Sequence, residues 1–458
     1  MLSQFEWILA VGGIFAFVAS FGIGANDVAN AFATSVGSGA LTIKNAVILA
    51  SVCEFTGALF MGGHVVKTIR KGISDQSCFE DDPGLLMYGC MCVLLSVALW
   101  LILASYLEMP VSTTHSCVGG MIGMTMIARG SSCVVWYAKT SQFPYVKGVV
   151  AIIVSWLLSP ILSGVFASLL FIILRNFILR SSNSYKRIQY AFPVLVGSTV
   201  IINTFFIVYK GAKFLNLDDT SVSKACAISF GLGGGTGILT YFLINPLIFK
   251  NQDVQVHTQE LEDGTVQSIH NNAEKFDEKT EYSMRYLQIL TACCDSFAHG
   301  ANDVANSIGP FASIYVIYKS GKVEKNADMG SDAYWILALG AAGIVFGLAL
   351  YGYKILHALG TKMAKLTPSR GICIELGAAC VIILGSRLGW PLSTTHCQVG
   401  ATVGVALLEG TGGINWKLLY KTIFGWLITL VVVALSTVLL FAQGAYAPMV
   451  KYPSYILA

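Results

Sequence analysis

Gly24-Ala25-Asn26-Asp27-Val28-Ala29-Asn30 is repeated without change as Gly300-Ala301-Asn302-Asp303-Val304-Ala305-Asn306. Each copy breaks an otherwise apolar stretch with two amides and a carboxylate. Such polar groups cost several kcal/mol each when they are buried in lipid without partners. Both copies are therefore expected to face something polar inside the protein.

A second motif is also present twice. Pro110-Val111-Ser112-Thr113-Thr114-His115 returns as Pro391-Leu392-Ser393-Thr394-Thr395-His396. The copies of the first motif lie 276 residues apart, and those of the second lie 281 residues apart. Because both the order and the spacing are kept, the sequence indicates an internal duplication.

The composition is that of a membrane protein. Hydrophobic residues make up 55% of the 458 residues and charged residues only 12%, whereas soluble domains carry about 25% charge. Apolar runs long enough to cross ~30 Å of hydrocarbon recur along the whole chain. The net charge of +4 is too small and too scattered to indicate a nucleic-acid partner.

Twelve apolar segments are expected to cross the membrane, and seven crossings separate the two copies of each motif. Because seven is odd, the copies would be inserted in opposite directions, which is the plan of many secondary transporters. The predicted fold class is therefore an all-α integral membrane protein in two inverted-topology repeats with broken or re-entrant helices. The predicted crossings are 6–23, 44–63, 84–107, 111–128, 147–174, 190–209, 226–249, 286–318, 333–356, 371–388, 392–408 and 418–442.

The predicted parts of the chain are a first transport repeat (1–174), a connecting region with two further transmembrane helices (175–285), and a second, inverted repeat (286–458). Polar loops at 175–189 and 250–285 fall on the same side by the count of crossings, and Arg370 joins them there. On this plan 15 Lys and Arg residues lie on that side and 14 on the other. Charge therefore does not set the orientation.

The two pairs of motifs resemble those of the inorganic phosphate transporter (PiT) family, and the likeness spans nearly the whole chain. The resemblance implies a cation-coupled symporter of inorganic phosphate that works by alternating access, with Na⁺ as the expected driver and H⁺ as the alternative. We expect a multi-pass protein of the plasma membrane with both termini extracellular. The expected partners are phosphate, Na⁺ or H⁺ and the lipid bilayer, with a homodimer as an option and no cofactor other than the transported ion.

The hydroxyl-rich motif suits an anion that must be released again. Each Ser-Thr-Thr run follows a proline, which favours the first turn of a helix, so free backbone N–H groups and the positive end of the helix dipole would point the same way. The alternative is that these residues only cap and pack helices. The predicted phosphate ligands are Ser112, Thr113, Thr114, Ser393, Thr394 and Thr395.

The acidic motif suits cations, because a carboxylate cannot bind an anion directly. Residues three and four apart share a helix face, so one turn can present an Asp and two Asn oxygens to a single ion. Cations bound there would neutralise the carboxylates and attract phosphate. The predicted Na⁺ ligands are Asn26, Asp27, Asn30, Asn302, Asp303 and Asn306.

Two further acids, Glu54 and Glu375, lie inside apolar runs, where a carboxylate is a functional candidate. By resemblance they match glutamates that the family needs for coupling or gating. Cys90 stands where a glutamate resembling the partner of Glu375 is expected. The two halves are therefore not expected to carry symmetrical acids.

Several polar residues have two open interpretations. Asp295 and His299 precede the second acidic motif without counterparts before the first; a structural pair between them is favoured over proton sensing. His115 and His396 could donate to phosphate or bond a neighbouring carbonyl. Cys78 and Cys133 are the two cysteines expected to be exposed, and a disulfide between them is the less favoured alternative.

Other functions remain as alternatives at this stage. Sulfate or arsenate could replace phosphate as the oxyanion. An intramembrane hydrolase would use Ser112, His115 and Asp27, but no G-x-S-x-G motif is present and the whole set is duplicated. A receptor without transport activity would not need two sets of buried acids.

Overall fold

The computed structural model describes residues 3–141, 145–209, 217, 220–249, 264–323, 330–388 and 390–446. Within these residues the chain is helical nearly throughout, with one antiparallel ribbon of β1 (Ala138–Lys139) and β2 (Val146–Lys147). The predicted all-α membrane fold is confirmed. Part of the predicted loop 250–285, up to residue 263, lies outside the described residues.

The first repeat and the pair of helices after it follow in chain order. The first repeat contains η1 (Ser3–Phe5), α1 (Glu6–Asn26), α2 (Ala29–Gly37), α3 (Ile43–Met61), α4 (Gly63–Gly72), η2 (Gln76–Phe79), α5 (Pro83–Tyr106), α6 (Thr113–Arg129), η3 (Ser131–Cys133) and α7 (Val149–Leu174). The connecting region contains the π-helical turn η4 (Arg175–Leu179), α8 (Ser184–Val208), α9 (Val222–Leu239), the π-helical turn η6 (Thr240–Ile244), α10 (Asn245–Phe249) and α11 (Gly264–Asn272).

The second repeat contains α12 (Glu278–Ser320), η7 (Gly330–Asp332), α13 (Ala333–Tyr351), α14 (Tyr353–Lys362), α15 (Pro368–Arg387), α16 (Thr394–Leu407), η8 (Thr411–Gly413) and α17 (Trp416–Ala445). Every predicted crossing thus corresponds to helix. In the described part of the chain, nine helices or helical runs are long and apolar enough to span a membrane. With 17 and 14 residues, α6 and α16 reach only about 26 and 21 Å, so they are half-helices that start inside the protein.

Helix contacts repeat between the halves. In the first, α1 packs on α5 and α13, and α7 packs on α16; in the second, α12 packs on α15 and α3, and α17 packs on α6. Exchanging the repeats converts each contact into its counterpart. This arrangement is a pseudo-twofold pair of repeats.

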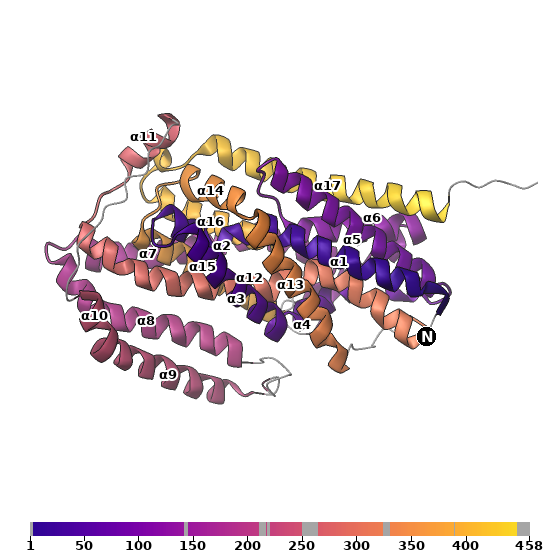
Figure 1. Cartoon of the computed structure of the whole chain (residues 1–458), viewed down its shortest axis with the longest axis horizontal. Coiled ribbons are helices and arrows are strands. Elements are labelled where there is room, and N and C mark those ends of the chain that lie inside the picture. Colours follow the sequence, from indigo (N-terminus) through magenta and orange to yellow (C-terminus); the bar gives the residue numbers. More distant parts are fainter. Residues whose placement is uncertain are drawn as a thin grey trace, which may run out of the picture.

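The repeats are inverted, because α1 and α5 start together at one end of the molecule and their counterparts α12 and α15 start together at the other. The ring of Phe5, before α1, lies against Gly84 at the start of α5, where an added Cβ would come within 2.5 Å of it. At the equivalent place in the second repeat, Glu281 of α12 accepts a hydrogen bond of 2.9 Å from the Ser369 amide at the start of α15. Figure 1 shows the N-terminus at one end of the molecule and α10 and α11 at the other.

Glycines let the repeats approach closely at equivalent points. A Cβ on Gly24 would lie 1.9 Å from the Ile344 carbonyl oxygen, and one on Gly300 would lie 2.3 Å from the Glu54 carbonyl oxygen. Backbone cannot move aside as a flexible side chain can. These contacts fix α1 against α13 and α12 against α3, with both acidic motifs beside them.

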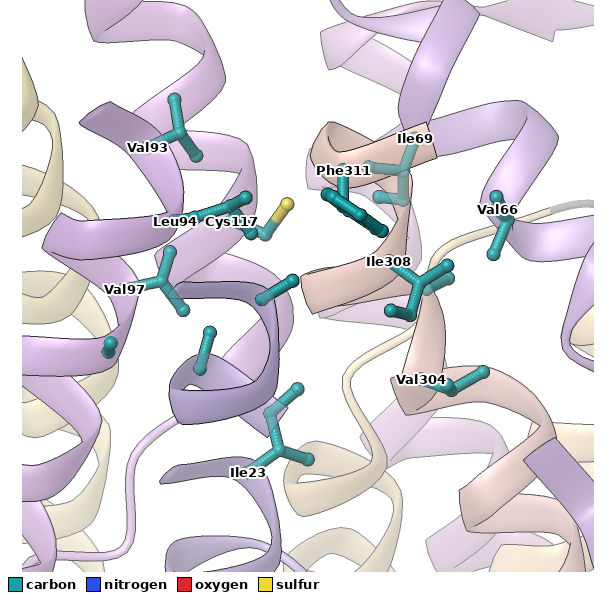
Figure 2. Packing of buried hydrophobic residues seen from close by; sticks show 14 of the residues in the cluster. Ile23, Val66, Ile69, Val93, Leu94, Val97, Cys117, Val304, Ile308 and Phe311 are labelled. Atoms are coloured by element: carbon teal, nitrogen blue, oxygen red, sulfur yellow. The ribbon is translucent and has the colours of Figure 1, made fainter. Parts of the chain in front are cut away.

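An apolar cluster lies between the acidic motifs and the end of the molecule that carries the N-terminus (Figure 2). Val93, Leu94, Cys117, Ile308 and Phe311, drawn from α5, α6 and α12, are at most 2% exposed. Their packing leaves this side of the molecule closed.

Hydrogen bonds to Glu274 join segments at one end of the molecule, and a disulfide joins segments at the other. At the far end, Arg180 donates two hydrogen bonds of 2.8 Å to Glu274, and Arg370 donates to the Glu274 carbonyl at 2.9 Å. These bonds confirm that the predicted loops and Arg370 share one side. At the N-terminal end, Cys78 and Cys133 form a disulfide, so the expectation that they stay unpaired was wrong; η2 and η3 bring together two residues that are 55 apart in sequence.

Candidate functional site

The two acidic motifs meet the two hydroxyl motifs in the middle of the molecule. Asp27 lies in the break between α1 and α2, and Asp303 lies within the continuous α12; both are at most 1% exposed. Thr113 Oγ1 is 2.9 Å from Asp27 Oδ2 and 3.2 Å from Asp303 Oδ2. Thr394 Oγ1 is 3.4 and 2.8 Å from the same two oxygens. Two hydroxyls therefore bridge carboxylates that belong to different repeats.

Amides and the remaining threonines complete this centre. Thr395 Oγ1 lies 2.5 Å from Asp27 Oδ1, and Asn30 donates to both Asp27 and Thr395. In the other repeat, Asn306 Nδ2 donates to the Thr113 and Thr114 hydroxyls at 3.1 and 3.2 Å. The structure thus brings together the residues that the sequence predicted from motifs far apart.

A histidine that the sequence analysis favoured as a partner of Asp295 belongs to the same centre. His299 Nε2 is 3.0 Å from Asp303 Oδ2, and Nδ1 is 2.9 Å from Glu54 Oε2. Ser296 donates to the other oxygen of Glu54 at 2.8 Å. Among the described residues no hydrogen bond or ion pair joins Asp295 to His299, so the favoured structural pair was wrong.

Asp27, His299 and Asp303 can together hold a metal ion. Each offers one ligand atom, and these atoms lie within 4.8 Å of one another. All three side chains are buried. Hard carboxylate oxygens suit Na⁺, and the Thr113 and Thr394 hydroxyl oxygens lie close enough to add further ligands.

The first asparagine of each motif holds the segment that leads into a half-helix. Asn26 donates to the Met109 carbonyl at 2.9 Å and accepts from the Val111 amide at 3.0 Å. Asn302 donates to the Leu392 carbonyl at 2.9 Å. Both side chains therefore fix the extended chain before α6 and α16.

The serines of the hydroxyl motifs are helix caps. Ser112 Oγ accepts from the His115 amide at 3.2 Å, and Ser393 Oγ accepts from the His396 amide at 3.3 Å. Such caps stabilise a helix by about 1 kcal/mol. The capping interpretation is thus correct for the two serines, and it places the N-terminal turns of α6 and α16 face to face at the carboxylates.

Threonines also tie the two half-helices to each other. Thr114 donates to the Leu392 carbonyl at 2.9 Å, and Thr395 lies 3.3 Å from the Val111 carbonyl oxygen. Each half-helix therefore contacts the segment that leads into the other. The positive ends of both helix dipoles converge on one point from opposite sides.

The two motif histidines lie behind the half-helices in an aromatic cluster. The His115 and His396 ring centroids are 4.8 Å apart, and His396 stacks on Trp426 at 3.6 Å. His115 Nδ1 contacts the Trp426 carbonyl at 3.1 Å, and His396 Nδ1 contacts Ser393 Oγ at 2.5 Å. For His115 the geometry agrees with a bond to a neighbouring carbonyl, whereas His396 contacts a hydroxyl.

Glu375 occupies a separate polar pocket between α2, α12 and α15. It is fully buried and accepts hydrogen bonds of 2.5 to 3.2 Å from Thr34, Ser35, Gln288 and Thr291. Glu54, by contrast, reaches the carboxylate centre through His299. Both glutamates therefore contact α12, but at different heights, and Glu375 also contacts α2.

A narrow pocket lies beside the centre, on the side of Asn30. It begins at Asn30, passes between α2 and α16, and ends at residues 363–366 after α14. Its lining consists of Asn30, Ala33, Thr34, Met363, Leu366, Gln398, Val399 and Thr402. The equivalent path on the other side is filled by the apolar cluster of Figure 2.

Comparisons with known proteins agree on one family. The family model described as the phosphate transporter family matches residues 23–437. A phosphate-repressible phosphate permease of Neurospora crassa is 30% identical over 94% of this chain and 96% of its own, and the chloroplastic inorganic phosphate transporter 2-1 of Arabidopsis thaliana is 34% identical over 93% and 70%. The solved structure of a sodium-dependent phosphate transporter is 32% identical, with a TM-score of 0.81 over 95% of this chain and 98% of that chain.

Proposed function

This chain belongs to the phosphate transporter family, and from that premise we propose that it is a secondary active transporter that carries inorganic phosphate together with Na⁺. The observation that carries the proposal is the shared centre, in which carboxylates and half-helix N-termini from both repeats meet. The similar protein of known structure is a sodium-dependent one, which supports Na⁺ as the driving ion. The family is one of transporters, not enzymes.

Cations occupy the carboxylate side of the centre in this proposal. Asp27 and Asp303 supply the charge, and Asn30 Oδ1, which is buried without a hydrogen-bond partner among the described residues, supplies a neutral oxygen. Asn306 takes the equivalent place in the other repeat. Asn26 and Asn302 act one step away, because their amides hold the extended segments that position the half-helices.

Phosphate binds at the facing N-termini of α6 and α16. The ligands are the hydroxyls of Thr113, Thr114, Thr394 and Thr395 together with the free backbone N–H groups of each first turn. Ser112 and Ser393 keep those turns in place as caps. No Lys or Arg is needed in the site, so the anion can leave again.

Coupling follows from the single proton of each hydroxyl. Thr113 and Thr394 can donate only once, and in this structure the oxygens nearest to them belong to Asp27 and Asp303. A cation on these carboxylates removes them as acceptors, and the hydroxyls can then donate to phosphate. Each solute thus favours binding of the other, which symport requires.

Proton coupling is the second candidate, and one observation favours it. His299 lies between the carboxylates of Glu54 and Asp303, with ring nitrogens 2.9 and 3.0 Å from them. A proton carried on this histidine could replace a cation in the cycle. The ion that drives transport must therefore be tested directly.

We place the side with the N-terminus outside the cell. The Cys78–Cys133 disulfide lies on that side, and disulfides persist in oxidising compartments. Both termini would then be extracellular in the plasma membrane, and the pocket beside Gln398 would open to the cytoplasm. The division into repeats at residues 174 and 285 and a homodimer stay predictions.

Purified protein in liposomes tests the proposal. Radiolabelled phosphate should accumulate under an inward Na⁺ gradient and not under a K⁺ gradient of the same size. Accumulation driven by an imposed pH gradient alone would favour proton coupling. Absence of phosphate uptake under every gradient would contradict the proposed function.

A further inference from the structure

The Gln398 side chain is a buried amide in the described part of the chain. It is 6% exposed, and neither its nitrogen nor its oxygen has a hydrogen-bond partner among the described residues. It lines the narrow pocket between α2 and α16. A buried polar group that stays unpaired is destabilising, so its presence requires another explanation.

The position of Gln398 connects the pocket to the centre. It follows Thr394 by four residues and Thr395 by three on α16, so it lies one turn further out on the same helix face. Thr402 continues this face by another turn, while Asn30 and Thr34, also four apart, line the pocket from α2. We call these four polar side chains, Asn30, Thr34, Gln398 and Thr402, the polar lane; the other four lining residues are apolar.

The other repeat shows that the fold does not require this amide. The equivalent position on α6, five residues after the capping serine, is Cys117, and the position one turn later is Met121. Both are at most 1% exposed within the apolar cluster, and Figure 2 shows Cys117 packed toward Phe311 and Leu94. Two repeats with the same helix packing thus differ in polarity at this point.

We propose that Gln398 is a substrate-contact residue, whose amide meets phosphate in the pocket as the ion moves between the centre and the outside. The amide offers two N–H donors for phosphate oxygens and one acceptor for a phosphate O–H, so it suits a partly protonated oxyanion. A cation would use only its oxygen. The inference rests on the proposed transport of phosphate and names a residue beyond the repeated motifs.

The test compares two substitutions at Gln398 with the same two at Gln443, an exposed residue near the end of α17. Gln398→Met replaces the amide by an apolar side chain of similar size. It should raise the phosphate concentration for half-maximal uptake by about two- to tenfold, because one hydrogen bond to phosphate is lost. Gln398→Glu should raise it further, because a carboxylate repels the anion. Gln443→Met and Gln443→Glu should leave it unchanged, and the half-maximal Na⁺ concentration at saturating phosphate should stay the same in all four variants.

A cysteine variant tests from which side of the membrane position 398 can be reached. Gln398→Cys should make uptake sensitive to a membrane-impermeant thiol reagent applied from the side of residues 363–366, and phosphate should slow the loss. Wild type, with ten free cysteines among the described residues, is the control. An unchanged half-maximal phosphate concentration in both Gln398→Met and Gln398→Glu, or a block that phosphate does not slow, would overturn this inference alone. Failure of wild type to take up phosphate would overturn the proposed function and this inference with it.

Discussion

The two repeats have the same backbone contacts but differ in the side chains along their longest helices. On α12, Gln288, Thr291, Asp295 and His299 lead up to Asp303; the equivalent positions on α1 carry Gly12, Phe15, Ala19 and Ile23 before Asp27. Glu54 contacts this polar face of α12, and the residue in its place in the second repeat is Ile344. The fold thus has symmetric glycines and caps, whereas the polar side chains of α12 that precede Asp303 have no polar counterparts on α1.

This difference separates the residues that hold the helices together from those proposed to meet the transported ions. The close helix contacts at Gly24 and Gly300 and the caps at Ser112 and Ser393 are present in both halves. The polar lane past Gln398 and the apolar cluster around Cys117 are not equivalent. A site between unequal halves can open to one side while the other stays closed, as alternating access requires.

The largest expected effect comes from the residues that are the same in both halves. Asp27→Asn and Asp303→Asn should each lower cation-driven phosphate uptake at least about 100-fold, because either change removes charge at the shared centre; this corresponds to about 3 kcal/mol. Protein should still reach the membrane. Uptake per amount of membrane-inserted protein is the measurement.

Asp81→Asn is the matched control for these variants. Its side chain is 69% exposed in a pair with Arg129, and exposed pairs contribute at most about 1 kcal/mol. Uptake by this variant should equal that of wild type. Normal Na⁺-driven uptake by either Asp27→Asn or Asp303→Asn would remove that carboxylate from the ion site.

The next effect tests the unequal acids. Glu375→Gln should lower uptake about tenfold and lower stability by about 2 kcal/mol, because an amide NH₂ would then face hydroxyl donors such as Thr34 and Thr291. Cys90→Ser changes the residue at the equivalent place on α5. It should lower uptake and stability by less than a third of the losses expected for Glu375→Gln. Thermal unfolding in detergent and uptake in liposomes check the two quantities separately.

The result with Glu375 distinguishes two roles. Equal losses in Glu375→Gln and Cys90→Ser would show that only packing matters at this position of the repeat. Unchanged stability with lost uptake would assign Glu375 to the transport cycle itself.

A smaller effect compares the two half-helices. Thr113→Val and Thr394→Val each remove one hydroxyl that bridges the carboxylates, and each should raise the half-maximal phosphate concentration about three- to tenfold. The two increases should agree within about twofold, since the hydroxyls occupy equivalent places. A titration of phosphate uptake measures this; an unchanged concentration in either variant would remove that threonine from the phosphate site.

The repeated motifs made much of this arrangement predictable. Identical letters in both halves, separated by an odd number of crossings, predicted inverted repeats, and the proline before each Ser-Thr-Thr run predicted the starts of α6 and α16. The structure confirms both features. The start of a half-helix is a local property of the chain, and the inversion follows from a count of crossings, so neither prediction needed contacts between distant segments.

Contacts between distant segments were not predictable in the same way. The pair of His299 with Glu54 spans 245 residues, and it depends on how α12 packs against α3, so the nearer Asp295 was wrongly favoured as the partner. Asn26 stays a predicted cation ligand, and the sequence did not indicate that its amide would also bond the backbone near Met109 and Val111. An amide can do either, and only the neighbouring chain decides.

The smallest expected effect is the contribution of the Arg180–Glu274 ion pair, at one end of the molecule, to the stability of the fold. Hydrogen bonds from Arg180 hold the pKa of Glu274 below its ordinary value, so the carboxylate stabilises the folded state at pH values above about 4.3, the ordinary pKa of a glutamate. That stabilisation is lost as the pH falls through the lowered pKa of Glu274. The Arg180 and Glu274 side chains are 49% and 31% exposed, so water screens the pair and the contribution of Glu274 should stay below about 1 kcal/mol.

Thermal unfolding of wild type and Glu274→Gln measures this contribution. The variant should be slightly less stable at pH 7, and the difference should shrink as the pH approaches the lowered pKa of Glu274. Reduction of the Cys78–Cys133 disulfide serves as the comparison for the other end, because a disulfide adds a pH-independent constraint of about 2–4 kcal/mol. A difference between wild type and Glu274→Gln that grows on acidification would contradict the ion pair as its source.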